Sequence, residues 1–140
     1  MKISVTVIVI AAIFLPACSD VLIEDHISGT WELQTYLRND MDETSEIKIR
    51  GYEESYQLDG TFSRTYTDGN QNLVDESGEY SINEDNSSIH ISDVSSISEF
   101  SDEHSTLSTS VIDVLVLDDT EFAYSFENGG DLHEFRFIKK

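Results

Sequence analysis

Few residues in this 140-residue chain have side chains that could carry out catalysis, and these are widely spaced. Its four histidines are His26, His90, His104 and His133. His90 stands between two isoleucines, so the alternation of a strand should turn its side chain outward. The chain contains no nucleophile elbow, no zinc-binding helix motif and no glycine-rich phosphate loop. We therefore expect no catalytic residues, no metal site, no cofactor and no enzymatic activity.

An acidic segment at residues 40–44 begins like a calcium-binding loop. Asp40, Asp42 and Thr44 place oxygen atoms at alternate positions. The sixth residue, Ser45, is not the glycine that an EF-hand needs for its sharp turn. A solvated acidic loop is the favoured interpretation.

The only cysteine, Cys18, follows an apolar run that spans residues 3–15 and is preceded by Lys2. The run is too short to cross a bilayer as a helix, which takes about 20 residues. A positive residue, an apolar run and a small residue before the cut are typical of a secretory signal. We predict a signal peptide at residues 1–17, cleaved between Ala17 and Cys18. An ordinary secretory signal that leaves Cys18 as a free thiol is the alternative.

Leu15-Pro16-Ala17-Cys18 resembles the lipobox of bacterial lipoproteins. The resemblance implies that Cys18 becomes the first residue and carries a thioether-linked diacylglycerol and usually an amide-linked acyl chain such as palmitate. Each buried CH₂ group contributes about 0.8 kcal/mol to membrane binding. Residues 18–26 would form a short acidic tether. In many Gram-negative bacteria an aspartate directly after the cysteine retains a lipoprotein in the inner membrane. Here Ser19 follows Cys18, so the resemblance implies sorting to the outer membrane. It does not decide whether the domain faces the periplasm or the cell surface.

The formal net charge of −20 disfavours some classes of partner. Such a charge repels phosphate backbones and anionic head groups, so we expect no nucleic-acid binding. The acidic residues are scattered along the chain, which is typical of a solvated surface. Residues 18–140 are enough for one domain and too few for two ordinary ones.

Residues 27–140 show strand and turn patterns almost throughout. Runs rich in apolar residues, most of them alternating with polar ones, predict strands at residues 29–36, 47–49, 56–58, 61–66, 78–82, 88–92, 111–117, 122–126 and 132–138. Gly51 predicts a bulge or break, and Asp59-Gly60 is the strongest hairpin signal. The aliphatic run at 111–117 predicts a strand buried on both sides. Residues 93–106 fit a short amphipathic helix or a covering loop equally well.

Most of these connections are tight turns, so the strands should form an antiparallel meander. A meander of about eight strands removes its exposed edges most simply by closing into a barrel. The sequence therefore predicts an all-β, up-and-down antiparallel barrel over residues 27–140.

Four short motifs follow one another along the strands: Gly29-Thr30-Trp31-Glu32-Leu33, Asp59-Gly60-Thr61-Phe62, Gly78-Glu79-Tyr80 and Phe135-Arg136-Phe137. Their order resembles that of the lipocalin superfamily, and more closely that of the lipocalin-like domains of envelope lipoproteins. The resemblance implies a barrel sealed at one end around Trp31, with an opposite end that can be open. In lipocalins a basic residue often covers this tryptophan. Arg136 is a candidate here, although alternation places it on the face opposite Phe135 and Phe137.

Nine aromatic residues fall on the expected inward face, where they line a cavity or form the core. They are Trp31, Phe62, Tyr66, Tyr80, Phe122, Tyr124, Phe126, Phe135 and Phe137. An eight-stranded barrel can hold one small ligand or be filled by side chains. Two functions follow. One is a lipoprotein that binds a small hydrophobic ligand; the other is a filled barrel that acts as an interaction or inhibitor module for an envelope protein partner, through its acidic outer face or its loops at 38–45 and 93–106.

The assignment of Cys18 can be tested on the native N-terminus. Mass spectrometry of the protein isolated from its cells should find a chain that begins at Cys18 and carries a diacylglyceryl group, because the lipobox resemblance implies both cleavage and lipidation. An unmodified Cys18 would contradict the lipoprotein assignment.

Overall fold

The computed structural model describes residues 22–92 and 111–140. They form one short helix and nine strands: α1 (Ile23–His26), β1 (Gly29–Arg38), β2 (Met41–Asp42), β3 (Arg50–Tyr56), β4 (Thr61–Thr67), β5 (Leu73–Ile82), β6 (Ser88–Ser92), β7 (Val111–Leu117), β8 (Glu121–Asn128) and β9 (Asp131–Lys139). The predictions for the signal peptide, for Cys18 and for residues 93–106 lie outside the described residues.

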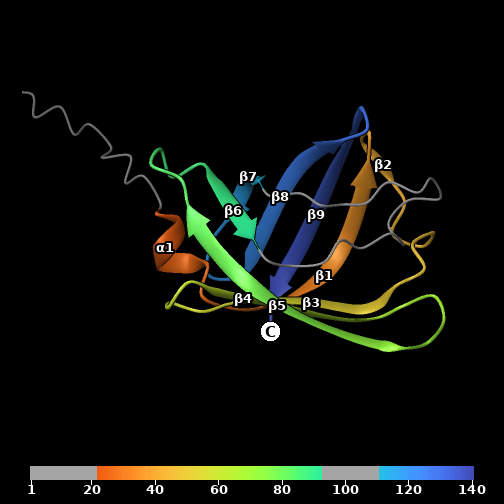
Figure 1. The fold of residues 1–140 in the computed structure, drawn as a ribbon. Coiled ribbons are helices and arrows are strands. Elements are labelled where there is room, and N and C mark those ends of the chain that lie inside the picture. Colours follow the sequence, from red (N-terminus) through yellow and green to blue (C-terminus); the bar gives the residue numbers. More distant parts are fainter. Residues whose placement is uncertain (1–21, 93–110) are drawn as a thin grey trace, which may run out of the picture.

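Eight of these strands close into an antiparallel barrel (Figure 1). Each strand from β3 to β8 pairs with the next one along the chain, and β1 pairs with both β3 and β9. The closing pair runs from Trp31 opposite Lys139 to Arg38 opposite His133. The two-residue β2 pairs only with the end of β1. The predicted all-β fold, the meander order and the closed barrel of eight strands are confirmed.

Tight turns between strands produce this order. At Asp59-Gly60, Gly60 has a φ of 85°, and the Thr61 amide donates to Asp59 Oδ1 over 3.0 Å. Gly129 and Gly130, with φ of 63° and 92°, form the two-residue turn between β8 and β9. Both glycines in positive φ match the type I′ turn that joins antiparallel strands most readily. The hairpin predicted at Asp59-Gly60 is confirmed.

The strand predicted at residues 47–49 is wrong, because β3 begins only at Arg50. Ile47 and Ile49 are buried nonetheless, as parts of an irregular segment that packs into the core. The bulge predicted at Gly51 is confirmed: its φ is 58°, and the pairing of β3 with β4 shifts register between Arg50 and Glu53.

The prediction that residues 111–117 are buried on both sides is also wrong. Ile112 is buried, but Val111 is 50% exposed and Leu115 is 49% exposed. A barrel has a single interior, so the outer face of each strand is left to solvent or to other segments. A register shift between Val114 and Val116 further interrupts the alternation on β7.

One end of the barrel is closed around Trp31, as the lipocalin resemblance implies. Trp31 is fully buried, and its indole N–H donates to the carbonyl of Ile27 over 2.8 Å. The amide of Ile23 donates to Asn86 Oδ1, which ties α1 to the loop between β5 and β6. The last four residues of the expected tether at 18–26 therefore form α1, and Ile23 is buried against the barrel.

Lys139, rather than Arg136, covers the tryptophan. Its ammonium lies 4.9 Å from the centroid of the Trp31 ring. Gly29 makes room for it, because a Cβ there would lie 2.8 Å from Lys139 Cε. Arg136 points outward and pairs with Glu134 at 2.6 Å, so the outward orientation predicted from alternation is confirmed.

Trp31 is the only tryptophan in the chain, so its fluorescence reports this contact. Lys139→Met should change the emission of Trp31 and lower the free energy of unfolding by about 0.5–1 kcal/mol, because it removes a cation from the ring face. Arg136→Met is the matched control and should leave the emission unchanged. Equal spectra for the two variants would contradict the assignment.

Candidate ligand-binding site

The nine aromatic residues expected on the inward face pack mainly against one another. Eight are buried, and Tyr80 is partly buried, with its ring edge-on to Tyr56 at 5.2 Å. The ring centroids of Phe122 and Phe137 lie 5.6 Å apart, and those of Tyr124 and Phe135 lie 5.2 Å apart. Stacked and tilted rings at these centroid distances are typical of a packed hydrophobic core. Along most of its length the barrel interior is therefore occupied by its own side chains.

A buried carboxylate lies within this aromatic core. Glu54 of β3 is 1% exposed. Three tyrosine hydroxyls donate to it: Tyr52 over 2.6 Å, Tyr56 over 2.8 Å and Tyr124 over 2.8 Å. Tyr52 and Tyr56 flank Glu54 on the same strand face, whereas Tyr124 reaches it from β8. The three hydroxyls satisfy a group that would be costly to bury alone.

Burial dominates the electrostatics of this cluster. It raises the pKa of Glu54, and the three hydroxyl donors oppose the rise only in part. Burial also raises the pKa of Tyr52, Tyr56 and Tyr124 well above the usual value. The phenols therefore stay protonated at physiological pH and act as donors.

Arg64 places a positive charge next to this cluster. It lies directly opposite Glu54 in the register of β3 and β4, and its Nε lies 2.5 Å from Glu76 Oε2. Its Nη2 atom is buried without a hydrogen-bond partner. Charged residues are almost always exposed, so the sequence alone did not predict that Glu54 and Arg64 are buried. The alternation Tyr52, Glu54, Tyr56 is the signal that could have placed Glu54 inside.

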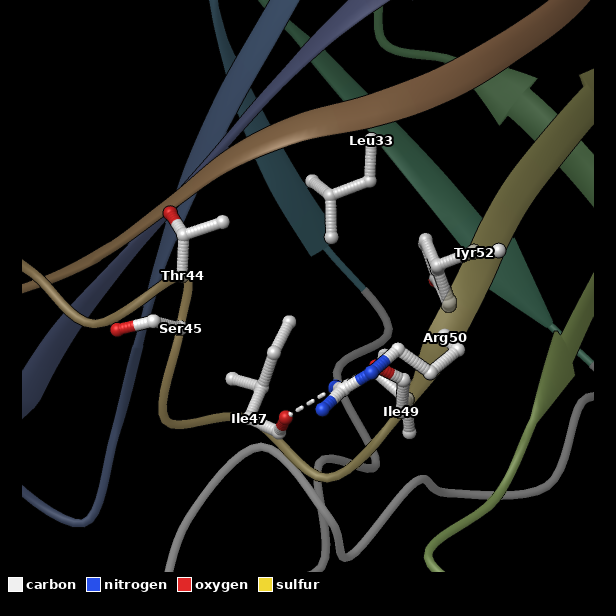
Figure 2. Close-up of a pocket in the computed structure, with 8 residues that line it drawn as sticks. Leu33, Thr44, Ser45, Ile47, Ile49, Arg50 and Tyr52 are labelled. Atoms are coloured by element: carbon white, nitrogen blue, oxygen red, sulfur yellow. Dashed lines mark hydrogen bonds between the residues drawn. The ribbon is translucent and has the colours of Figure 1, made fainter. Parts of the chain in front are cut away.

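A pocket of about 370 Å³ opens at the end of the barrel where β3 begins (Figure 2). Its wall is apolar at Leu33, Ile47 and Ile49. Polar groups complete it, and the full lining is Leu33, Thr44, Ser45, Ile47, Ile49, Arg50, Gly51 and Tyr52. The irregular segment between β2 and β3 supplies half of these residues, and β1 and the start of β3 supply the other half. Figure 2 shows Leu33 and Ile47 pointing into the space from opposite sides.

None of the nine aromatic residues expected to line a cavity or form the core lines this pocket. Tyr52 connects the pocket to the interior, because it lines the pocket and also donates to Glu54. Its ring further contacts Phe135 and Phe137, with centroids 6.4 and 6.2 Å away. The pocket therefore ends on the aromatic core rather than running through it.

Two solved structures share this architecture. A lipocalin-like protein from Bacteroides uniformis ATCC 8492 matches 81% of this chain and 98% of its own, with a TM-score of 0.57 and 16% identity. The chain has a lipocalin-like fold. An uncharacterized protein from Bacteroides eggerthii DSM 20697 matches 81% of this chain and 99% of its own, with a TM-score of 0.51 and 18% identity. No family model matches the chain, and a search of curated proteins finds no match.

The lipocalin-like barrel brings no histidines together within the described residues. His133 is buried, stacks on Phe126 at 5.1 Å and lies 2.8 Å from the Tyr36 hydroxyl through Nδ1. Burial lowers its pKa, so the ring is neutral at physiological pH. His26 pairs with Asp119 at the surface, and His90 is exposed, as alternation predicts. His104 lies outside the described residues.

Residues 22–92 and 111–140 contain no group of three or more histidine, cysteine or acidic side chains placed to hold a metal ion. The acidic segment at 40–44 makes its own contacts: the Thr44 amide donates to Asp42 Oδ1 over 2.9 Å, and Glu43 pairs with Arg38 at 3.0 Å. Over the same ranges, no helix has the length and apolar character needed to cross a membrane.

The raised pKa of Glu54 predicts a specific pH dependence of stability. The folded chain holds this proton more tightly than the unfolded chain, whose pKa is about 4.5. The contribution of Glu54 to stability is therefore full below pH 4.5 and is lost as the pH rises through the raised folded pKa. The side chain of Glu54→Gln cannot ionise. As the pH rises above 4.5, the free energy of unfolding of Glu54→Gln should therefore increase relative to that of the wild type.

Denaturant unfolding from about pH 4 to about pH 8 measures this difference. Glu79→Gln, at an exposed position of β5, is the control and should follow the wild type. Glu54→Leu should be destabilised by about 3 kcal/mol or more, since three buried hydroxyls lose their acceptor. A constant difference between Glu54→Gln and the wild type at every pH would contradict the assignment.

Proposed function

We propose that this protein is a non-enzymatic, lipid-anchored lipoprotein of the outer membrane that binds a small hydrophobic molecule at the end of its lipocalin-like barrel. The observation that carries the proposal is the pocket of about 370 Å³ bounded by Leu33, Ile47 and Ile49. Its volume is within the range of about 300–1,000 Å³ that is usual for small-molecule sites. Its apolar wall fits a ligand with an apolar body.

The filled interior limits where such a ligand can bind. The packed aromatic rings of Phe122, Phe135 and Phe137 occupy the barrel interior. Glu54 and its three tyrosine partners lie within this aromatic core. A ligand in the pocket would rest on Tyr52 rather than enter the core. The site would accordingly hold a small molecule or one segment of a longer one.

The proposed anchor is consistent with this placement. Cys18 precedes Ile23, the first buried residue of the described chain, by only a few positions. α1 lies at the closed end of the barrel, near Trp31, whereas the pocket lies where β3 begins. A chain attached to the membrane through Cys18 would hold the closed end near the bilayer and turn the pocket away from it.

The second candidate function is an interaction or inhibitor module with a protein partner in the envelope. The filled interior favours it, and so do the exposed apolar side chains of Val111, Leu115 and Val116 on β7. These residues form the outer face of one strand, where a partner could bury them.

A pocket-filling variant separates the two functions. The probe is a straight-chain alcohol that carries a photoreactive diazirine, applied to the full protein in its own membranes. It should label residues 44–52 of the wild type, and Ser45→Trp should reduce this labelling by roughly fivefold or more, because an indole at this exposed position fills the pocket.

Leu115→Trp places the same indole on the outer face of β7 and serves as the control, with labelling expected to stay at the wild-type level. If residues 44–52 are not labelled, or if Ser45→Trp labels as strongly as the wild type, the pocket does not bind the probe and the interaction module is favoured.

A further inference from the structure

Arg50 differs from every other arginine of the chain in its partners. The sequence contains four arginines, and all are described. Arg38 pairs with Glu43 at 3.0 Å, Arg64 with Glu76 at 2.5 Å and Arg136 with Glu134 at 2.6 Å. Within the described residues, Arg50 pairs with no carboxylate, and it bonds only the carbonyls of Ile47 and Ile49. An arginine with no carboxylate partner in the described part of the chain is unexpected when the net charge is −20.

The contacts of Arg50 hold its guanidinium at the pocket. Nη1 donates to both carbonyls over 2.8 Å; Figure 2 shows the side chain lying along the pocket wall toward Ile47. These two bonds use one nitrogen, so Nε and Nη2 keep N–H groups for another acceptor. A guanidinium that is already held in place loses less conformational freedom on binding an anion than a free side chain would.

The rest of the lining suits an anionic group beside an apolar one. Among the described residues, no acidic side chain lines the pocket, and Thr44 and Ser45 add hydroxyl groups. Leu33 and Ile49 offer an apolar surface within the same pocket.

We propose that the ligand is an amphiphile with an apolar chain and one anionic head group, and that Arg50 selects it by binding the head group. This inference rests on the proposed function, since it names the ligand class and the specificity-determining residue of the same pocket. Carboxylates and phosphates both match the planar fork of a guanidinium. The head group lies at the exposed rim beside Arg50, and the chain lies against Leu33 and Ile47.

The test uses three diazirine probes with the same alkyl chain: a carboxylate, a monoalkyl phosphate and the neutral alcohol. The full protein is labelled in its own membranes, and adducts at residues 44–52 are counted by mass spectrometry. Each probe partitions into the membrane equally for every variant, so the anion-to-alcohol labelling ratio can be compared between variants. The wild type should label about fivefold more strongly with at least one anionic probe than with the alcohol, and the larger ratio identifies the head group.

Arg50→Gln should lower this ratio to about one while leaving alcohol labelling unchanged. Arg136→Gln, which removes an arginine paired with Glu134 on the outer face, is the control and should keep the wild-type ratio. If Arg50→Gln also loses alcohol labelling, because its bonds to Ile47 and Ile49 shape the wall, Arg50→Lys should restore alcohol labelling and a ratio above one. If Arg50→Lys restores alcohol labelling but its anion-to-alcohol ratio stays at one, the inference is overturned.

Two further results distinguish this inference from the proposed function. A wild type that labels equally with all three probes, in a manner that Ser45→Trp blocks, overturns the role of Arg50 and leaves the pocket as a site for neutral ligands. A wild type in which no probe labels residues 44–52 overturns both. An anion preference that persists in Arg50→Gln shows that another group selects the head and also overturns the inference.

Discussion

The pairing of β1 with β9 is the constraint on which the rest of the structure depends. It joins residues from opposite ends of the described chain, from Trp31 with Lys139 to Arg38 with His133, and it turns an open meander into a barrel with one interior. Because eight strands enclose a space that side chains can just fill, the inward aromatic residues form the core. The same closure leaves one face of every strand outside, which explains why the aliphatic residues of β7 are only partly buried.

Closure also places Glu54 where water cannot reach it. The carboxylate is retained among aromatic rings because three hydroxyls donate to it and Arg64 lies opposite it in the sheet. A buried carboxyl group costs less free energy when hydrogen-bond donors surround it, as the three hydroxyls surround Glu54. Tyr52 belongs to this cluster and also to the pocket. A change in the pocket that moved Tyr52 would therefore also alter the hydrogen bonds of Glu54.

The pocket forms where the irregular segment before β3 meets the barrel strands β1 and β3. The segment before β3 turns Ile47 and Ile49 into the core and leaves Arg50 at the rim, held by the carbonyls of those two isoleucines. The two solved structures from Bacteroides support the barrel, and at 16% and 18% identity they show the fold alone. The ligand class must accordingly come from residues of this chain, of which Arg50 is the most informative.

Local patterns in the sequence determined the strand order, the turns and the direction of many side chains. Asp59-Gly60 and Gly129-Gly130 predict tight turns because of their backbone preferences, and alternation places Phe135 inward and Arg136 outward. The cleavage site at Cys18 is likewise a local pattern, and it remains a prediction. Only the tertiary structure decided that Tyr124 donates to Glu54, that Lys139 covers Trp31 and that Arg50 pairs with no carboxylate of residues 22–92 and 111–140. A period of two assigns a residue to a face, but it does not say which distant strand supplies the neighbour, because that depends on register and closure around the whole barrel.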